Sequence, residues 1–142
     1  FEAIPVGKGS KIRGGEGVAI LTIGHPGNFA VAACDELAKE NLYPAHYDMR
    51  FVKPLDSILL HEVFSNFTNI LQVEDGCIMG GFGSAVAEFM IYNNCNAHIV
   101  RLGIPDHFIE HGEQKELYAE FGFDKYAIIT AVRKLLSSEV MV

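Results

Sequence analysis

The stretch that decides the fold runs from Val73 to Phe89 and reads Val-Glu-Asp-Gly-Cys-Ile-Met-Gly-Gly-Phe-Gly-Ser-Ala-Val-Ala-Glu-Phe. Residues 69–73 lead into it and are mostly apolar, which favours a short strand. Beyond the glycines, apolar residues recur at the spacing of an amphipathic helix, namely Phe82, Ala85, Val86, Phe89 and Met90. Glycines between a strand and a helix permit a tight turn and close packing of the two. The stretch therefore predicts one strand–turn–helix unit.

Other segments repeat this unit. Three more apolar runs predict strands at residues 18–23, 45–49 and 97–102. Helices are expected to start at the capping residues Asn28, Asp56 and Asp124. A further short helix is expected at 113–121. Strands that alternate with helices predict a three-layer α/β/α domain, doubly wound around a mostly parallel sheet, with room for one antiparallel edge strand near 11–13.

Length and composition limit the classes of protein to consider. The chain has 142 residues, of which 49% are hydrophobic, and this is enough for one domain with a full core. We expect residues 1–17, which are rich in glycine, to be an incoming linker or edge segment and residues 18–142 to form the domain. Because the chain begins with Phe1 rather than Met, we expect it to be part of a longer protein.

Charge and cysteine content bear on partners and location. The net charge is −7 and no basic run is present, which argues against nucleic acid and anionic membranes as partners. No apolar stretch approaches the roughly 20 residues needed to span a bilayer. The cysteines are odd in number and form no C-x-x-C pair, so reduced thiols in a cytoplasmic protein are the expectation for Cys34, Cys77 and Cys95.

Two motifs carry possible chemistry. Residues 81–86 approach the dinucleotide fingerprint G-x-G-x-x-G/A, but Val86 fills the third small position and Arg101 stands where the next strand would offer an acidic residue. A structural turn is therefore the preferred interpretation, with nucleotide binding as the alternative. Residues 107–111 match the H-x-x-E-H zinc signature. Since Pro105 and Gly112 leave no room for a long helix, we expect His107 and His111 not to hold zinc.

Three more side chains near the turn were considered as functional groups. Glu74 and Asp75 are adjacent carboxylates at the end of a strand, where ligands bind in open α/β sheets. Neighbours on an extended backbone point in opposite directions, so a capping or interface role is favoured over a shared metal or an acid–base role. Cys77 lies near a helix N-terminus but has no evident partner, and we interpret it as a buried thiol. The residues alone thus predict no complete catalytic, cofactor or metal site.

Several segments resemble, in order along almost the whole chain, the C-terminal domain of the 1-deoxy-D-xylulose-5-phosphate synthase family. The segments that carry the resemblance are Val6–Gly9, Asp48–Asp56, Val73–Glu88, Gly103–Gly112 and the residues from Glu116 onward. Small departures, such as Gly76 in the turn and Phe123, leave the resemblance intact.

The resemblance implies the third domain of a transketolase-like enzyme. Such an enzyme condenses pyruvate with glyceraldehyde 3-phosphate, releases CO₂ and feeds isoprenoid and thiamine biosynthesis. The resemblance also implies thiamine diphosphate and Mg²⁺ as cofactors of the parent, a homodimer, and upstream domains that hold cofactor and substrates. The resemblance assigns no catalytic role to any residue of this chain, and this fragment alone is expected to be inactive. A transketolase, a 2-oxoacid dehydrogenase β-subunit and a stand-alone nucleotide-binding module remain alternatives.

We expect an interaction surface at the glycine-rich turn. Ile78, Met79 and Phe82 are large apolar residues in a turn where all three are unlikely to pack inward. The alternative is that these side chains fold back onto the core of the domain itself.

Overall fold

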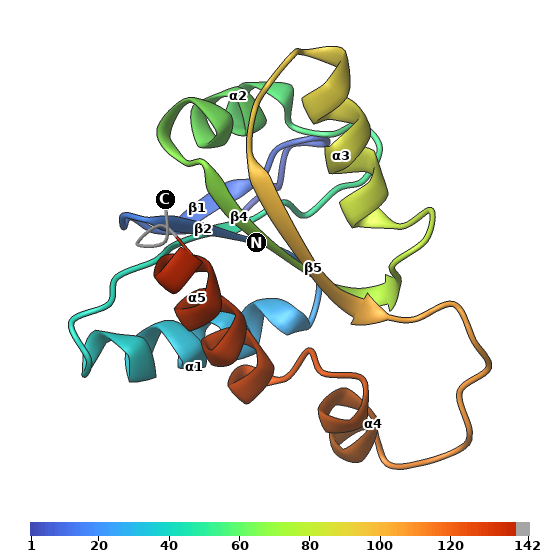
Figure 1. Ribbon diagram of the computed structural model, residues 1–142. Helices are drawn as coiled ribbons and strands as arrows, with labels where there is room; N and C mark the ends of the chain where they lie inside the picture. The colour runs from blue at the N-terminus through green and yellow to red at the C-terminus, as the bar shows by residue number, and fades with distance from the viewer. Residues whose placement is uncertain (139–142) are drawn as a thin grey trace.

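A five-stranded sheet organises residues 1–138, the residues that the computed structural model describes (Figure 1). Its strands are β1 (Ser10–Arg13), β2 (Val18–Ile23), β3 (Ala45–Asp48), β4 (Asn69–Cys77) and β5 (His98–Ile104). The spatial order is β1-β3-β2-β4-β5. β1 pairs antiparallel with β3, and the other neighbouring strands are parallel. The predicted mostly parallel sheet with one antiparallel edge strand is confirmed.

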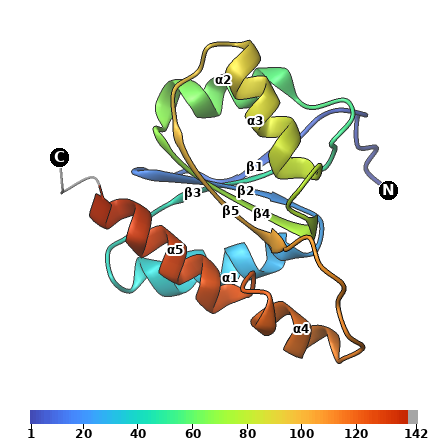
Figure 2. The ribbon, with the colours of Figure 1, turned by 45° about the vertical axis from the view of Figure 1, so that its right-hand side comes forward.

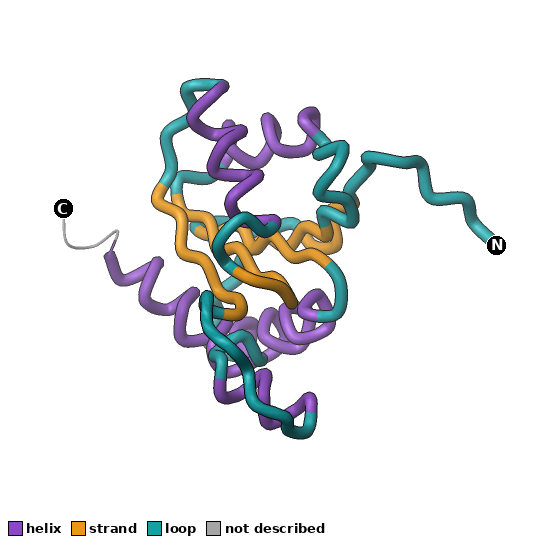
Figure 3. The backbone as a smooth tube through the Cα atoms, turned by 90° about the vertical axis from the view of Figure 1, so that its right-hand side faces the viewer, coloured by secondary structure: helices purple, strands orange, loops and turns teal. Residues whose placement is uncertain are grey.

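Helices cover both faces of the sheet. They are α1 (Pro26–Ala38), α2 (Ser57–Asn66), α3 (Phe82–Tyr92), α4 (Gln114–Glu120) and α5 (Lys125–Ser138). α2 and α3 lie on one face, and α1 and α5 lie on the other, with α4 on the same side as α1 and α5 (Figures 1 and 2). Viewed along the sheet, the three layers separate clearly, and the N-terminal segment leads away from them (Figure 3). This is the predicted α/β/α arrangement.

Alternating side chains of the central strands divide the core in two. On the α1/α5 face, Val18 and Ile20 of β2 join Leu71 and Val73 of β4. On the α2/α3 face, the buried residues include Ala19, Leu21 and Ile70, together with Phe82 and Val86 of α3. β2 is buried along nearly its whole length, as its continuous apolar run predicts for a strand covered on both sides.

Helix starts follow the predicted caps in two of three cases. The Asp56 carboxylate accepts from the Leu59 amide at 3.1 Å, and the Asp124 carboxylate accepts from the Ala127 amide at 2.9 Å. The prediction for Asn28 is wrong, because α1 already begins at Pro26 and Asn28 lies within its first turn. Proline at the start of a helix has its φ preset and lacks only an N–H that would have had no helical partner.

β4 is longer than its apolar run suggests. It continues beyond Val73 to Cys77, and its register with β5 shifts between these residues. The pairing resumes at Cys77 opposite Ile104, and the Ile78 amide donates to the Ile104 carbonyl at 2.8 Å. β2 pairs with β4 only as far as Glu74, and beyond that residue Asp75 and Cys77 are exposed at the carboxyl end of β4.

Candidate functional site

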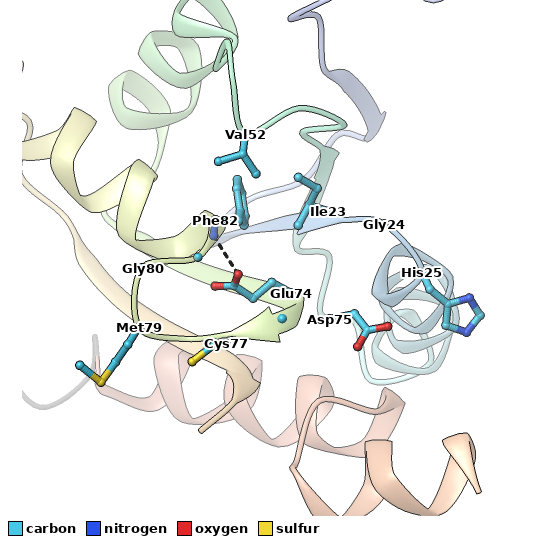
Figure 4. Close-up of a pocket in the computed structure, with 12 residues that line it drawn as sticks. Ile23, Gly24, His25, Val52, Glu74, Asp75, Cys77, Met79, Gly80 and Phe82 are labelled. Atoms are coloured by element: carbon cyan, nitrogen blue, oxygen red, sulfur yellow. Dashed lines mark hydrogen bonds between the residues drawn. The ribbon is translucent and has the colours of Figure 1, made fainter. Parts of the chain in front are cut away.

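The strand order reverses direction between β2 and β4. The chain leaves β2 towards β3 on one side, and it leaves β4 towards β5 on the other. In open α/β sheets, ligands bind at the carboxyl ends of the strands on either side of such a switch point. A hollow of about 540 Å³ lies there, and we call it the switch-point hollow (Figure 4). Its lining includes Ile23, His25, Glu74, Asp75 and Met79.

Glu74 is the buried acid of this hollow. It is 5% exposed, and one carboxylate oxygen accepts from the Phe82 amide at 2.8 Å (Figure 4). The other oxygen accepts from the Gly83 amide at 3.0 Å. These amides belong to the first turn of α3, where backbone N–H groups have no partner within the helix. A negative charge there is also favoured by the helix dipole. Glu74 thus caps α3 from the neighbouring strand, which confirms the capping interpretation for this residue.

The glycines of the turn make room for this carboxylate. A Cβ on Gly81 would lie 2.2 Å from the Glu74 Oε2 atom. A Cβ on Gly83 would lie 2.6 Å from the Arg101 Nε atom and 2.7 Å from the Gln72 Oε1 atom. Gly80 adopts a φ of 76°, a left-handed conformation that favours glycine. Close approach and backbone shape therefore account for the three glycines without a bound nucleotide.

Arg101 braces the turn from β5. Its guanidinium donates to the Ile78 carbonyl and, at 2.9 Å, to the Ser84 hydroxyl. The same hydroxyl accepts from the Gly80 amide at 3.0 Å. Arg101 is the residue that stands where a dinucleotide site would offer an acid to a ribose. Because the first amides of α3 already bind Glu74 and Arg101 holds the loop, the geometry favours a structural turn over a nucleotide site.

Asp75 faces away from Glu74, as adjacent residues of a strand must. It is exposed, and its Oδ2 atom accepts from the Tyr118 hydroxyl of α4 at 2.8 Å. Burial and the neighbouring Asp75 carboxylate raise the pKa of Tyr118. The two carboxylates therefore make different contacts. Glu74 binds the first amides of α3, whereas Asp75 connects the sheet to α4.

The expected interface residues divide between core and surface. Phe82 is 2% exposed and packs in the core between Val52 and Ile23, so the expectation that it serves a partner needs correction (Figure 4). The reason is that Phe82 opens α3 and points along the helix face that covers the sheet. Ile78 is half-buried. Met79 is 68% exposed and points away from the domain (Figure 4). An interface at this turn remains a prediction that now rests mainly on Met79.

The interpretation of Cys77 as a buried thiol is wrong. Its side chain is exposed, at the carboxyl end of β4 beside Met79. β2 pairs with β4 only as far as Glu74, so Cys77 has no strand beside it on that side.

The H-x-x-E-H segment lies in the loop between β5 and α4. His107, Glu110 and His111 are exposed, and residues 105–113 are not helical. One face of a helix therefore does not bring the two histidines together here. Within residues 1–138, no group of three His, Cys, Asp or Glu side chains is arranged to hold a metal ion. No helix in that range has the length and hydropathy to cross a membrane.

One buried histidine was not singled out by any pattern. His46 on β3 is 1% exposed, and its Nε2 atom lies 2.9 Å from the Thr22 hydroxyl. Burial, together with the nearby Arg13 charge, lowers its pKa to about 4. A histidine within a strand gives only a weak sequence signal, because the residue pattern predicts the strand and not the charge state of a polar side chain in it.

Comparisons with known proteins identify the family of this domain. The model of the transketolase C-terminal domain matches residues 7–128. A split-gene transketolase, described as an inactive β4 tetramer, superposes with a TM-score of 0.83 at 28% identity, over 94% of this chain and 43% of that one. A Campylobacter jejuni transketolase, at 15% identity and a TM-score of 0.62 over 90% of this chain and 18% of that one, shares the fold.

Sequence relatives are more specific. The chain is 58% identical over 135 residues to the 1-deoxy-D-xylulose-5-phosphate synthase of Cytophaga hutchinsonii, which covers 95% of this chain and 21% of the relative. It is 40% identical to the synthase of the same name from Geobacillus sp., over 96% of this chain and 22% of the relative. The chain thus spans about a fifth of the length of the curated relatives it matches. It belongs to the transketolase C-terminal domain family and is homologous to the C-terminal region of 1-deoxy-D-xylulose-5-phosphate synthases.

Proposed function

We propose that this chain is the C-terminal domain of a cytoplasmic 1-deoxy-D-xylulose-5-phosphate synthase. The parent would be a thiamine-diphosphate- and Mg²⁺-dependent transferase that condenses pyruvate with glyceraldehyde 3-phosphate, releases CO₂ and supplies isoprenoid and thiamine biosynthesis. The observation that carries this proposal is the 58% identity, over 95% of the chain, to a relative of that name.

Within the parent, the domain serves structure and association rather than catalysis. The residues described here do not fit the cofactor, because a diphosphate needs free backbone donors and Mg²⁺ needs a set of oxygen ligands. The amides of Phe82 and Gly83 at the start of α3 are already bound to Glu74. Asp75, the other carboxylate of the hollow, accepts from Tyr118. We therefore assign these side chains no part in the catalytic reaction.

Met79 supports a role in association with the upstream domains or with a second copy in a homodimer. An exposed apolar side chain on a turn that Arg101 and Ser84 hold in place is a suitable contact, because the backbone of the turn loses little conformational entropy when the side chain is covered. Covering Met79 would contribute about 1.5–3 kcal/mol. Met79→Glu in the full-length protein should therefore weaken association, as measured by sedimentation. An unchanged sedimentation profile would show that the interface does not lie at this turn.

The activity is tested on the full-length protein. With thiamine diphosphate and Mg²⁺, it should consume pyruvate and glyceraldehyde 3-phosphate and release CO₂ in equal amounts. A transketolase, the alternative, would leave pyruvate unconsumed. Absence of CO₂ release from an enzyme that is otherwise shown to bind its cofactor would contradict the proposal.

The division of roles is tested on the chain of 142 residues itself. Calorimetry with thiamine diphosphate and Mg²⁺ should detect no binding, while circular dichroism shows the chain folded. Micromolar binding that depends on Mg²⁺ would contradict a purely structural role.

A further inference from the structure

The segment from residue 105 to residue 121 is weakly attached to the rest of the domain. It leaves the end of β5, swings outward and returns as α4 (Figure 1). Residues 106–116 are all exposed, including Phe108. A segment that buries so little surface gains little from packing, and local opening concentrates in such regions.

Tyr118 is the main point at which this segment is held, and the partly buried Phe121 packs against the same core cluster. It is the buried residue of α4, and its ring lies among those of His25, Phe29 and Phe123, at centroid distances of 5.7, 5.4 and 4.8 Å. Its hydroxyl donates to Asp75 on β4 at 2.8 Å. One side chain therefore provides both an aromatic contact with the α1 side and a hydrogen bond to the sheet.

α4 depends on this contact for its own structure. It has seven residues, fewer than the roughly 12–15 that an isolated helix needs to be even marginally stable in water. Its N-cap residue, Glu113, makes no side-chain capping hydrogen bond. At its other end, Gly122 has a φ of 71° and turns the chain before the buried Phe123. Once Tyr118 leaves its site, the helical hydrogen bonds of α4 have little to maintain them, whereas Phe123 stays anchored in the core.

We propose that residues 105–121 form a strap that opens as a unit while the rest of the domain stays folded, and that Tyr118 is its latch. A hollow of about 320 Å³ lies between the strap and the rest of the domain, and its lining includes Leu117 and Tyr118 of the strap. Opening would remove that wall and expose Asp75, Ile104 and Phe123, which line the other side. Asp75, which accepts the hydrogen bond from Tyr118, also lines the switch-point hollow. The strap then controls access to the carboxyl edge of the sheet from the β5 side.

Hydrogen exchange in the full-length protein tests this directly. The reporters are the amides of Leu117 and Phe121, which donate to Glu113 and Leu117 within the closed strap. In the wild type they should exchange faster than the amide of Leu71, a buried residue of central strand β4.

Two variants separate the parts of the latch. Tyr118→Phe keeps the ring and removes the hydroxyl, so we expect the strap amides to exchange about tenfold faster, which corresponds to about 1.4 kcal/mol. Tyr118→Ala also removes the ring contacts and should exceed that change. The matched control is Tyr126→Phe, because Tyr126 is 69% exposed on α5. It should leave the strap unchanged, and Leu71 should keep its rate in both phenylalanine variants.

Trypsin provides a second readout at Lys115, which lies within the strap. Cleavage there should rise in Tyr118→Phe in step with exchange. The proposal is overturned if the strap amides exchange as slowly as Leu71 in the wild type, since the strap would then open only with global unfolding. It is also overturned if Tyr118→Phe leaves exchange and cleavage unchanged, or speeds exchange of the strap and of Leu71 equally. Tyr118→Phe decides the question even if the alanine variant fails to fold.

Discussion

Replacing Glu74 by alanine is expected to lower the free energy of unfolding of this domain by about 3 kcal/mol. The carboxylate is 5% exposed and accepts two backbone amides, from Phe82 and Gly83. Loss of a helix cap costs about 1 kcal/mol, and loss of a hydrogen bond to a charged group costs about 1.5–3 kcal/mol. The two costs overlap, because the same bonds are counted in both, so the estimate stays near the larger figure.

Urea denaturation of the chain, followed by circular dichroism, measures this change. About 3 kcal/mol should also appear as a melting temperature lower by about 10 °C in a domain of this size. Glu74→Gln places an NH₂ group against a backbone N–H but retains one acceptor oxygen. Because one hydrogen bond is kept, the loss of unfolding free energy should be smaller than for alanine, about 1–2 kcal/mol. The matched control is Glu88→Ala, which removes an exposed carboxylate from the same helix and should change stability by less than about 0.5 kcal/mol.

Equal destabilisation of the chain by Glu74→Ala and Glu88→Ala would contradict this prediction. The carboxylate of Glu74 would then be replaceable by water at the start of α3, and the closeness of Gly81 to it would need another explanation.

Two further predictions concern single residues. Phe82→Ala should cost about 3–5 kcal/mol in urea denaturation because Phe82 is a core residue, whereas Met79→Ala should stay within about 0.5 kcal/mol; equal effects would contradict the placement of both side chains. For His46, the folded-state pKa of about 4 lies below the unfolded value near 6.5, so below pH 6.5 the unfolded state binds the proton first. The free energy of unfolding should therefore fall as the pH drops from about 6.5 towards 4, by about 3 kcal/mol in all, and His46→Gln should remove that contribution to the slope between pH 6.5 and 5.

Local pattern was enough to predict the layers of this fold. The apolar run of β2 and the caps Asp56 and Asp124 are properties of short stretches. They are predictable because a strand or helix packed against a core buries its side chains at a fixed period. The alternation of side chains along a strand also predicts that Glu74 and Asp75 face opposite ways. The family, too, was recognisable from ordered short segments, and it is confirmed by the match over residues 7–128.

The candidate site was predictable only in outline. The sequence indicated the turn, its glycines and a capping role for an adjacent acid, but it did not indicate which partner each acid would have. Glu74 binds amides eight and nine residues away, Arg101 reaches back 23 residues to Ile78, and Asp75 meets Tyr118 across 43 residues. Such pairs depend on how strands and helices pack together, and the spacing of residues within one strand or helix does not predict this packing.

The same distinction explains the errors at the turn. The residue pattern is enough to place Cys77, Met79 and Phe82 where a strand gives way to a helix. Which of these side chains is covered depends on how the neighbouring strands and helices pack around them. Phe82 points into the core because α3 packs across the sheet, whereas Cys77 and Met79 are exposed at the end of β4, beyond the last residue with which β2 pairs. Burial depends on what lies opposite a side chain, and that is set by the ends of neighbouring strands rather than by the residue's own place in the chain.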